Sequence, residues 1–532
     1  MMRRISTGEA TEAAHRLSRK DALPPRGGMD SILASRKKES PPDEGARAAQ
    51  HGEKRAYRPI PKSVLDPGKH PPQKEFGKKA PGEPGIPRWF LPHGARNVAD
   101  GGASVLTPLF IKDALGGNVG MVGVVSAAVS MASVPAAVAW GELSDRFQKR
   151  KLFILLGYFG TGLMYILMGL SMGELEFLGL NVIYGVVAAA SVPIGTLIIT
   201  ETMPSKRWPH YIGAYTRMGG MGWIIGLLIG GIWLEVGASG LDTVTAMRLL
   251  FIMLGAVGIL GGFMAMKMIP EPPVKPFAPH RVDKLVMFQG RIVERVRYLP
   301  LWMYKWRYRG EMHRIRTSGE AVPKPLKLYF AASLLLFSGF QTVFTPFPIF
   351  MSDRLGTSGL EIFLVYLVNS MTAAYMYSRV GDIIPRFGEK ASLIKANIIR
   401  AGLFAGFGLL ALLTNYGLKL PHLLVMALLF GMMAGVGFFW AFVSVASLTL
   451  VSRCAPAGAK GENVGLFNAT VSIGGIVGSL AGGYVALALG YPVSFFTGTG
   501  LVVAGIVMLS LNRGLDELGQ PSADKEWKEP DT

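Results

Sequence analysis

Long apolar runs dominate this sequence, and they limit what the chain can fold into. Each run holds about twenty residues, the length at which a helix crosses the hydrocarbon core of a bilayer. The chain is 50% hydrophobic and only 17% charged, which is too apolar for a soluble domain with a polar surface. We therefore predict an all-α integral membrane protein with about twelve transmembrane helices, near residues 93–114, 119–141, 152–172, 176–202, 210–235, 246–268, 326–351, 358–380, 391–414, 421–450, 462–488 and 491–511.

The polar links between these runs differ in charge. Alternate links carry the cations Arg146, Lys149, Arg150, Lys151, Lys206, Arg207, Arg386, Lys390, Arg453 and Lys460. The other links carry mainly the acids Glu174, Glu176, Asp242 and Asp353. Because basic links remain in the cytoplasm, we expect both termini there and the protein in the plasma membrane. The net charge of +19 thus lies beside the lipid bilayer, and no nucleic-acid partner is needed to explain it.

Composition divides the chain into five segments. Residues 1–90 are basic, rich in Pro and Gly, and lack an apolar run or signal peptide, which indicates a disordered cytoplasmic tail, either solvated or lying on anionic lipid. Residues 91–268 and 326–512 are expected to form two bundles of six helices. Residues 269–325 form a basic cytoplasmic linker, in which alternating apolar and basic residues suit either an interfacial helix or one packed on the bundle ends. Residues 513–532 form a second cytoplasmic tail.

An internal repeat relates the two bundles. Glycines recur at the same spacing in the fifth and eleventh predicted spans, as Gly213, Gly222, Gly226, Gly230 and Gly231 and as Gly465, Gly474, Gly478, Gly482 and Gly483. A proline precedes each set, at Pro204 and Pro456. Small residues at this spacing let helices cross closely in lipid. The repeat therefore predicts two pseudo-symmetric bundles around a central transport site.

The link after the second span carries a motif. From Gly141 to Lys151 it reads Gly-Glu-Leu-Ser-Asp-Arg-Phe-Gln-Lys-Arg-Lys. This resembles the loop pattern G-x-L-x-D-R-x-G-R-K of the major facilitator superfamily, with Gln148 in place of the second glycine. A decayed copy, containing Gly381, Asp382 and Arg386, follows the eighth span. The resemblance covers about residues 93–511 and implies a secondary transporter, which we expect to act as a monomer on a small-molecule substrate.

The fifth-span glycines sharpen this resemblance. They fit the pattern G-x8-G-x3-G-P-x2-G-G, which is typical of the antiporter and drug-efflux branches of the superfamily, although Leu227 replaces the proline. The resemblance thus favours efflux coupled to protons. Uptake of a sugar or another small nutrient remains the alternative, as does a receptor or scaffold that keeps the fold without transporting.

Charged residues beside the motif suggest a gate. Asp145 can lie near the positive N-terminal end of the eleventh span. Arg146 or Arg150 can pair with Glu201, whose counterpart in the repeat is Arg453. We expect these contacts to latch the two bundles together and to break when the cavity opens inward; the alternative is that the charges only set topology. The full candidate set is Gly141, Asp145, Arg146, Arg150, Glu201, Asp382, Arg386 and Arg453.

Few ionisable residues fall inside the spans, where charges are costly and usually functional. Asp100 is the candidate for proton coupling, with Arg96 one turn before it; the alternative is a neutralised structural pair. Arg217 and Arg400 are the other charges in mid-span. As the resemblance implies, the first, fourth, seventh and tenth spans should line the cavity, with the eighth adding one residue. The candidates are Thr107, Tyr184, Gln341, Thr345, Asn369 and Trp440, which suit a neutral, amphipathic or weakly cationic solute.

The sequence gives no support for catalysis. The eight histidines are scattered, and neither a metalloprotease motif nor a phosphate-binding G-K-[ST] occurs. The single cysteine, Cys454, excludes an intramolecular disulfide and a multi-cysteine metal site. We therefore expect no enzymatic activity, no cofactor and no metal.

Overall fold

The fold is described here from a computed structural model. It covers residues 87–147, 149–204, 208–237, 239–271, 322–417, 420–455 and 460–518. Almost all of the predicted N-terminal tail, most of the linker and most of the C-terminal tail lie outside these residues. The disorder and the interfacial helix predicted there therefore stay predictions.

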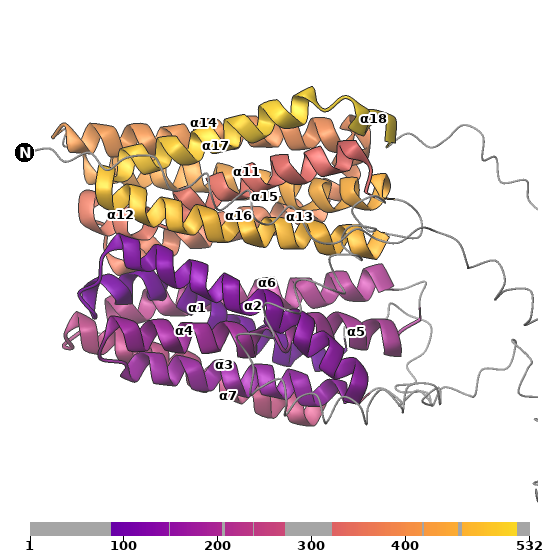
Figure 1. Cartoon of the computed structure of the whole chain (residues 1–532). Coiled ribbons are helices and arrows are strands. Elements are labelled where there is room, and N and C mark those ends of the chain that lie inside the picture. The colour runs from indigo at the N-terminus through magenta and orange to yellow at the C-terminus, as the bar shows by residue number, and fades with distance from the viewer. Residues whose placement is uncertain are drawn as a thin grey trace, which may run out of the picture. The chain divides into compact units, whose positions relative to one another are not determined.

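The N-terminal half consists of helices drawn from indigo to magenta in Figure 1. They are α1 (Leu91–Asp113), α2 (Val119–Phe147), α3 (Arg150–Leu170), α4 (Glu174–Ala188), α5 (Val192–Thr202), α6 (Trp208–Ile232) and α7 (Thr243–Met268), with the short turns η2 (Arg88–Phe90) and η4 (Trp233–Gly237). A short loop separates α4 from α5, where the sequence predicted one span. Pro193, in the first turn of α5, cannot continue the backbone hydrogen bonds of α4.

The C-terminal half repeats this arrangement. Its helices are α11 (Lys324–Phe344), α12 (Phe347–Leu355), α13 (Gly359–Phe387), α14 (Glu389–Asn415), α15 (His422–Cys454), α16 (Lys460–Leu489), α17 (Tyr491–Leu511) and the short α18 (Gly514–Leu518). The seventh predicted span is divided between α11 and α12 at Pro346. In both halves a proline thus interrupts one span.

The described helices confirm an all-α membrane protein. Ten of them, with α11 and α12 taken as one, are long and apolar enough to cross a bilayer. Two further elements complete the predicted set of about twelve. Helix α1 has the length but carries four charged side chains, and the α4–α5 pair is divided by its break.

The glycine repeat places equivalent helices in contact. Helix α1 packs on α6 and α7, as α11 packs on α16 and α17. At four glycines a Cβ atom would crowd the neighbouring helix: Gly222 against Gly94, Gly226 against Val98, Gly474 against Leu334 and Gly478 against Ser338. Each partner on α11 lies the same number of residues after its counterpart on α1. Helices α1 and α11 therefore occupy equivalent positions, residue by residue.

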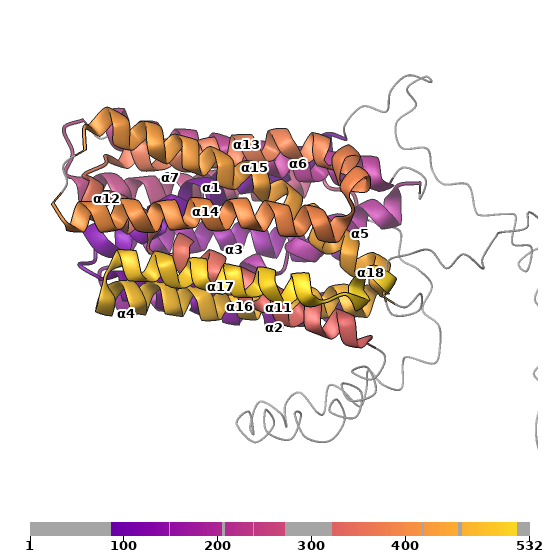
Figure 2. The same ribbon diagram turned by 90° about the horizontal axis from the view of Figure 1, so that it is seen from above.

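The two halves meet through α2 with α16 and through α6 with α13, pairs that lie side by side in both views (Figures 1 and 2). We call the end of the bundles where α1 ends at Asp113 the lock end. We call the end where α2 ends at Phe147 the motif end. At the lock end, a Cβ at Gly123 would lie 3.1 Å from the Gly483 Cα, and one at Gly231 would lie 3.0 Å from Leu360. The halves are thus tightly packed there.

At the motif end, glycines of the repeat and of the two loop motifs make no such contacts. No described atom lies within 4 Å of where a Cβ would stand on Gly141, Gly213, Gly381 or Gly465. Gly213 and Gly465 were expected to pack against other helices, and Gly141 to allow a close approach; in this conformation they do not. Of the other predicted packing glycines, Gly230 contacts Phe363 of α13 and Gly482 contacts Thr342 of α11. The close contacts between the halves therefore lie at the lock end.

Candidate functional site

An ion pair lies in the interior of the N-terminal half. Arg96 Nη2 is 3.1 Å from Asp100 Oδ2, because residues four apart share one face of α1. Both side chains are buried. The hydroxyls of Tyr165 on α3 and Tyr184 on α4 donate to Asp100 Oδ1 at 2.8 and 3.2 Å. The Tyr158 ring lies beneath the Arg96 guanidinium, 5.8 Å from it. Three helices thus converge on a single carboxylate.

The depth of this cluster makes it a candidate for proton transfer. Asp100 is thirteen residues from the end of α1 at Asp113, or about 20 Å along the helix axis. A charge at such depth is costly unless paired, and a buried titratable pair is a typical feature of proton relays in transporters. The carboxylate can accept a proton only by giving up its ion pair with Arg96. Protonation of Asp100 therefore changes the ion pairing within α1.

The C-terminal half buries an arginine in a different setting. Arg400 on α14 is 1% exposed. Its guanidinium carbon lies 3.9 Å from the ring centroid of Phe340, 5.1 Å from that of Trp440 and 5.3 Å from that of Phe404. Nε and Nη1 have no hydrogen-bond partner among the described residues. Sequence reasoning noted this arginine but assigned it no role.

At the motif end, Arg150 pairs with Glu201. Its Nη2 lies 2.9 Å from Glu201 Oε1, its Nε donates to Oε2 at 3.2 Å, and its Nη1 donates to Ser144 Oγ at 2.8 Å. This bidentate arrangement ties the ends of α2, α3 and α5 together. All three helices belong to the N-terminal half. The pair thus differs from the expected latch, because it joins helices of one half.

The C-terminal half carries the same pair with its charges exchanged. Arg453, at the end of α15, lies 2.8 Å from Glu389 at the start of α14. Arg453 is 54% exposed at its side chain, so this pair is less buried than the one between Arg150 and Glu201. Asp382 and Arg386, from the decayed motif, are exposed, and no ion pair joins them within the described residues.

Two further latch candidates have side chains that the structure does not describe. Asp145 and Arg146 belong to the last turns of α2, but their side chains are not among those described. The predicted contacts of Asp145 with the start of α16 and of Arg146 with Glu201 therefore stay predictions.

A polar cluster at the lock end joins the two halves, and sequence reasoning missed it. Lys112 on α1 pairs with Asp353 on α12 and donates to Ser352 Oγ at 2.9 Å. The Tyr491 hydroxyl donates to Asp353 Oδ2 at 2.6 Å. Lys112 and Asp353 are 240 residues or more apart, so no local pattern could pair them. The sequence held one signal for this pair. Lys112 is a cation at the end of the first predicted span, and Asp353 is an acid at the end of the seventh, which is the first span of the second bundle.

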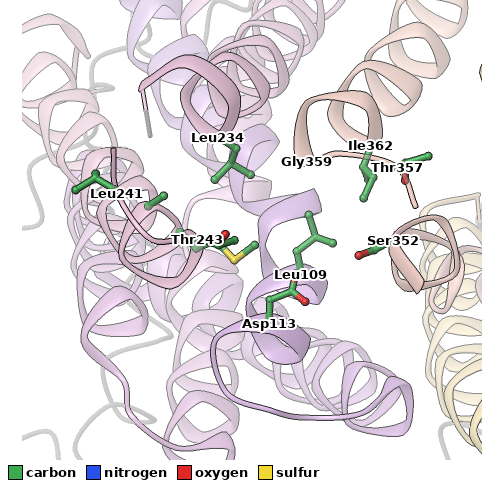
Figure 3. A pocket seen from close by; sticks show the side chains of 11 residues that line it. Leu109, Asp113, Leu234, Leu241, Thr243, Ser352, Thr357, Gly359 and Ile362 are labelled. Carbon is green, nitrogen blue, oxygen red and sulfur yellow. The ribbon is translucent and has the colours of Figure 1, made fainter. Parts of the chain in front are cut away.

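A small cavity lies beside this lock cluster (Figure 3). Its volume is about 210 Å³, below the range of about 300–1,000 Å³ that is typical of small-molecule sites. Leu109 and Asp113 on α1 and Ser352 and Ile362 from the other half contribute side chains to it. Leu109 is nine residues beyond Asp100, about 14 Å along α1. This cavity therefore belongs to the lock cluster and not to the buried ion pair.

The predicted cavity residues divide into two groups. Tyr184 lies at the Asp100 cluster and Trp440 at Arg400, so the structure brings both beside a buried charge. The Thr107 hydroxyl donates to Ala103 O in its own helix, at 2.8 Å. Asn369 Nδ2 donates to Met433 O at 3.0 Å and so ties α13 to α15, which is a packing role.

Thr345 and Gln341 are on the divided seventh span. Thr345 is buried at the break between α11 and α12, and its backbone amide donates to Gln341 O at 3.0 Å. The Gln341 side chain is half-buried, and its Cβ lies 2.9 Å from where a Cβ on Gly478 would stand. Gln341 thus lines the α11–α16 contact.

Comparison with known proteins supports the fold and the family. A model of the Major Facilitator Superfamily matches residues 96–470. An uncharacterised MFS-type transporter of Methanocaldococcus jannaschii is 23% identical over 387 residues, which cover 73% of this chain and 87% of the relative. The multidrug resistance protein MdtG of Yersinia enterocolitica is 31% identical, but over only 110 residues, or 21% of this chain and 26% of the relative.

Solved structures show the same architecture. The crystal structure of a POT family transporter in complex with 5-aminolevulinic acid aligns with a TM-score of 0.61 at 15% identity, over 80% of this chain and 96% of that one. At this identity the likeness concerns the fold alone. The family match covers most of the chain, and the family is one of transporters and not of enzymes. This chain therefore belongs to the Major Facilitator Superfamily.

Proposed function

We propose that this secondary transporter exports a small solute in exchange for protons, and that Asp100 carries the proton. The observation that carries the proposal is the environment of Asp100: a buried carboxylate paired with Arg96 and bonded to two tyrosine hydroxyls. Such a group can hold a proton or an ion pair but not both. Exchange between the two states is what coupled transport requires.

The contrast between the two ends supports alternating access. The halves are packed together at the lock end through Gly123 and Gly231, while four glycines at the motif end have no described atom within 4 Å of where a Cβ would stand. The positive-inside rule places the basic links of the motif end in the cytoplasm. On that orientation the described conformation is closed to the outside and receives solute from the cytoplasm.

Helix α1 connects the proton site to the lock. Asp100 lies near its middle and Lys112 near its end, and Lys112 pairs with Asp353 of the other half. Protonation of Asp100 would free the Arg96 side chain and alter the interior contacts of α1. A change there can bias the cross-half pair, because both groups move with one helix.

Export is favoured by the glycine pattern of α6 and by the partial likeness to a multidrug resistance protein. The same cycle of conformations in the opposite direction would give uptake. The direction of the luminal pH change separates exchange from co-transport, whichever way the protein is inserted in a vesicle.

The test uses the purified full chain in proteoliposomes that contain a pH-sensitive dye. Compounds that raise the thermal unfolding midpoint are first selected, and vesicles are then loaded with one of them. For proton exchange, the luminal pH falls as the solute leaves. A rise in luminal pH would instead show co-transport and overturn the export proposal.

The Asp100→Asn variant tests the proton site. We expect it to retain solute exchange while losing the solute-dependent pH change. The matched control is Asp242→Asn, because Asp242 is exposed and caps α7, and asparagine caps helices as well as aspartate does. An intact pH change in the Asp100→Asn variant would refute the assignment.

A further inference from the structure

Within the part of the chain that the structure describes, the buried charges are paired, with one exception. Among the described residues, five charged side chains are at most 9% exposed. Four of them are in ion pairs: Arg96 with Asp100, Arg150 with Glu201, and Glu389 with Arg453. The fifth is Arg400, the most deeply buried, and no described carboxylate lies within ion-pair distance of it. The interior therefore carries one uncompensated positive charge.

The internal repeat shows where a counter-charge is missing. The glycine contacts relate Val98 on α1 to Ser338 on α11. Two residues further along each helix stand Asp100 and Phe340. The position that supplies the carboxylate in the N-terminal half thus supplies an aromatic ring in the C-terminal half. The Arg400 guanidinium stacks over that ring at 3.9 Å.

Aromatic rings compensate for only part of the cost of burying this charge. A cation–π contact is weak compared with the cost of removing an unpaired ion from water. Two guanidinium nitrogens also lack hydrogen-bond partners among the described residues. A transported anion could pair with the guanidinium and accept those unused hydrogen bonds.

The surroundings of Arg400 indicate the form of such an anion. Phe340, Phe404 and Trp440 present flat apolar faces around the guanidinium. Tyr377 on α13 is the described ionisable group near this guanidinium, and its side chain is 44% exposed.

We propose that Arg400 binds the carboxylate of a monoanionic solute whose apolar or aromatic body packs on Phe340 and Trp440. This rests on the proposed transport function, because it names the charge class of the transported solute. It replaces the neutral or weakly cationic solute expected from the sequence. A single negative charge matches the single uncompensated positive charge.

The test measures binding and needs no transport. The thermal unfolding midpoint of the purified full chain is recorded at constant ionic strength with sodium benzoate, octanoate, acetate or inorganic phosphate. Benzamide serves as the neutral analogue of benzoate. We expect benzoate or octanoate to raise the midpoint by about 2 °C or more at saturating concentration, and benzamide to leave it unchanged.

Variants identify the site. In Arg400→Gln the anion-dependent shift should disappear, while Arg400→Lys should keep a smaller shift because it retains the charge but not the planar fork. The control is Arg217→Gln, which removes an exposed arginine of α6 and should leave the shift intact.

A second readout separates a binding role from a structural one. Without ligand, the Arg400→Gln midpoint should be unchanged or higher, because an unpaired buried charge has been removed. A lower midpoint for both Arg400 variants, or equal shifts in Arg400→Gln and the wild type, would overturn the proposal. So would the absence of any anion-dependent shift in the wild type. Anion binding without flux would refute the transport proposal instead, so the two failures are distinguishable.

Discussion

The two halves of this protein share a packing scheme and differ in how each holds its buried arginine. In the N-terminal half, Arg96 is neutralised by Asp100, which also accepts hydrogen bonds from two tyrosine hydroxyls. In the C-terminal half, Arg400 lies among aromatic rings, and Phe340 takes the place of the acid. The contacts of Gly222 and Gly226 with α1 recur as those of Gly474 and Gly478 with α11. The difference teaches that the repeat preserves backbone geometry while the interior chemistry of each half has diverged.

The largest effect should come from making the N-terminal half resemble the C-terminal one. Asp100→Asn leaves Arg96 buried without its counter-charge, and we expect a loss of about 3–5 kcal/mol in the free energy of unfolding. The double variant Arg96→Gln/Asp100→Asn should recover most of this loss, because it removes both charges. Chemical denaturation of the purified protein measures the free energy of unfolding of the single and the double variant. A double variant as unstable as the single one would mean that the ion pair is not the source of the effect.

The reverse change should make the C-terminal half resemble the N-terminal one. Phe340→Glu places a carboxylate beside Arg400, and we expect it to pair with the guanidinium and to abolish the benzoate-dependent shift. Phe340→Gln is the uncharged control, which loses the same ring. Comparing the benzoate-dependent midpoint shifts of the two variants separates the effect of the added charge from the effect of losing the ring. If both variants bound benzoate as the wild type does, Arg400 would not be the anion site.

The exchanged ion pairs at the motif end offer a smaller comparison. Glu201→Gln removes the partner of the more buried arginine, Arg150, and should cost about 1–3 kcal/mol. Glu389→Gln removes the partner of an arginine that is 54% exposed, Arg453, and should cost less than about 1 kcal/mol. Thermal unfolding of the two variants under the same conditions gives the order. Equal losses would show that burial does not distinguish these pairs.

The smallest expected effect concerns the place where the halves meet. Asp353→Asn weakens a partly exposed pair with Lys112, by about 0.5–1 kcal/mol, and should shift the population toward a conformation open at the lock end. We would follow maleimide labelling of Leu109→Cys in a Cys454→Ser background, since Leu109 lines the cavity beside the lock. Labelling should be about two to five times faster than with the control Asp242→Asn. An unchanged rate would remove the lock from the mechanism.

The fold could be predicted in large part from the sequence because the bilayer imposes strict lengths on apolar helices. The runs that became α3, α7, α14 and α17 begin and end within a few residues of their predicted limits. The breaks at Ser191 and Pro346 were not predicted. A proline inside an apolar run can end, kink or simply accompany a helix, and neighbouring helices decide which.

The candidate site was only partly accessible to such reasoning. Residues close in sequence, such as Arg96 and Asp100, follow from helical spacing. Glu201 was expected to act between the halves, but the structure pairs it with Arg150 inside one half. The lock formed by Lys112 and Asp353 was not anticipated, because it joins parts of the chain that only the packing of the two halves brings together.

By itself, the sequence determined the membrane location, the helical class, the two-fold repeat and the short list of buried charges. These follow from local quantities: run length, residue spacing and the cost of a charge in lipid. Only the tertiary structure decided which of those charges is neutralised. Helical spacing already offered Arg96 a partner in Asp100, but nothing in the sequence showed what surrounds Arg400. The structure separates them because the field at a buried arginine depends on side chains from other helices, and those meet it only when the bundle is assembled.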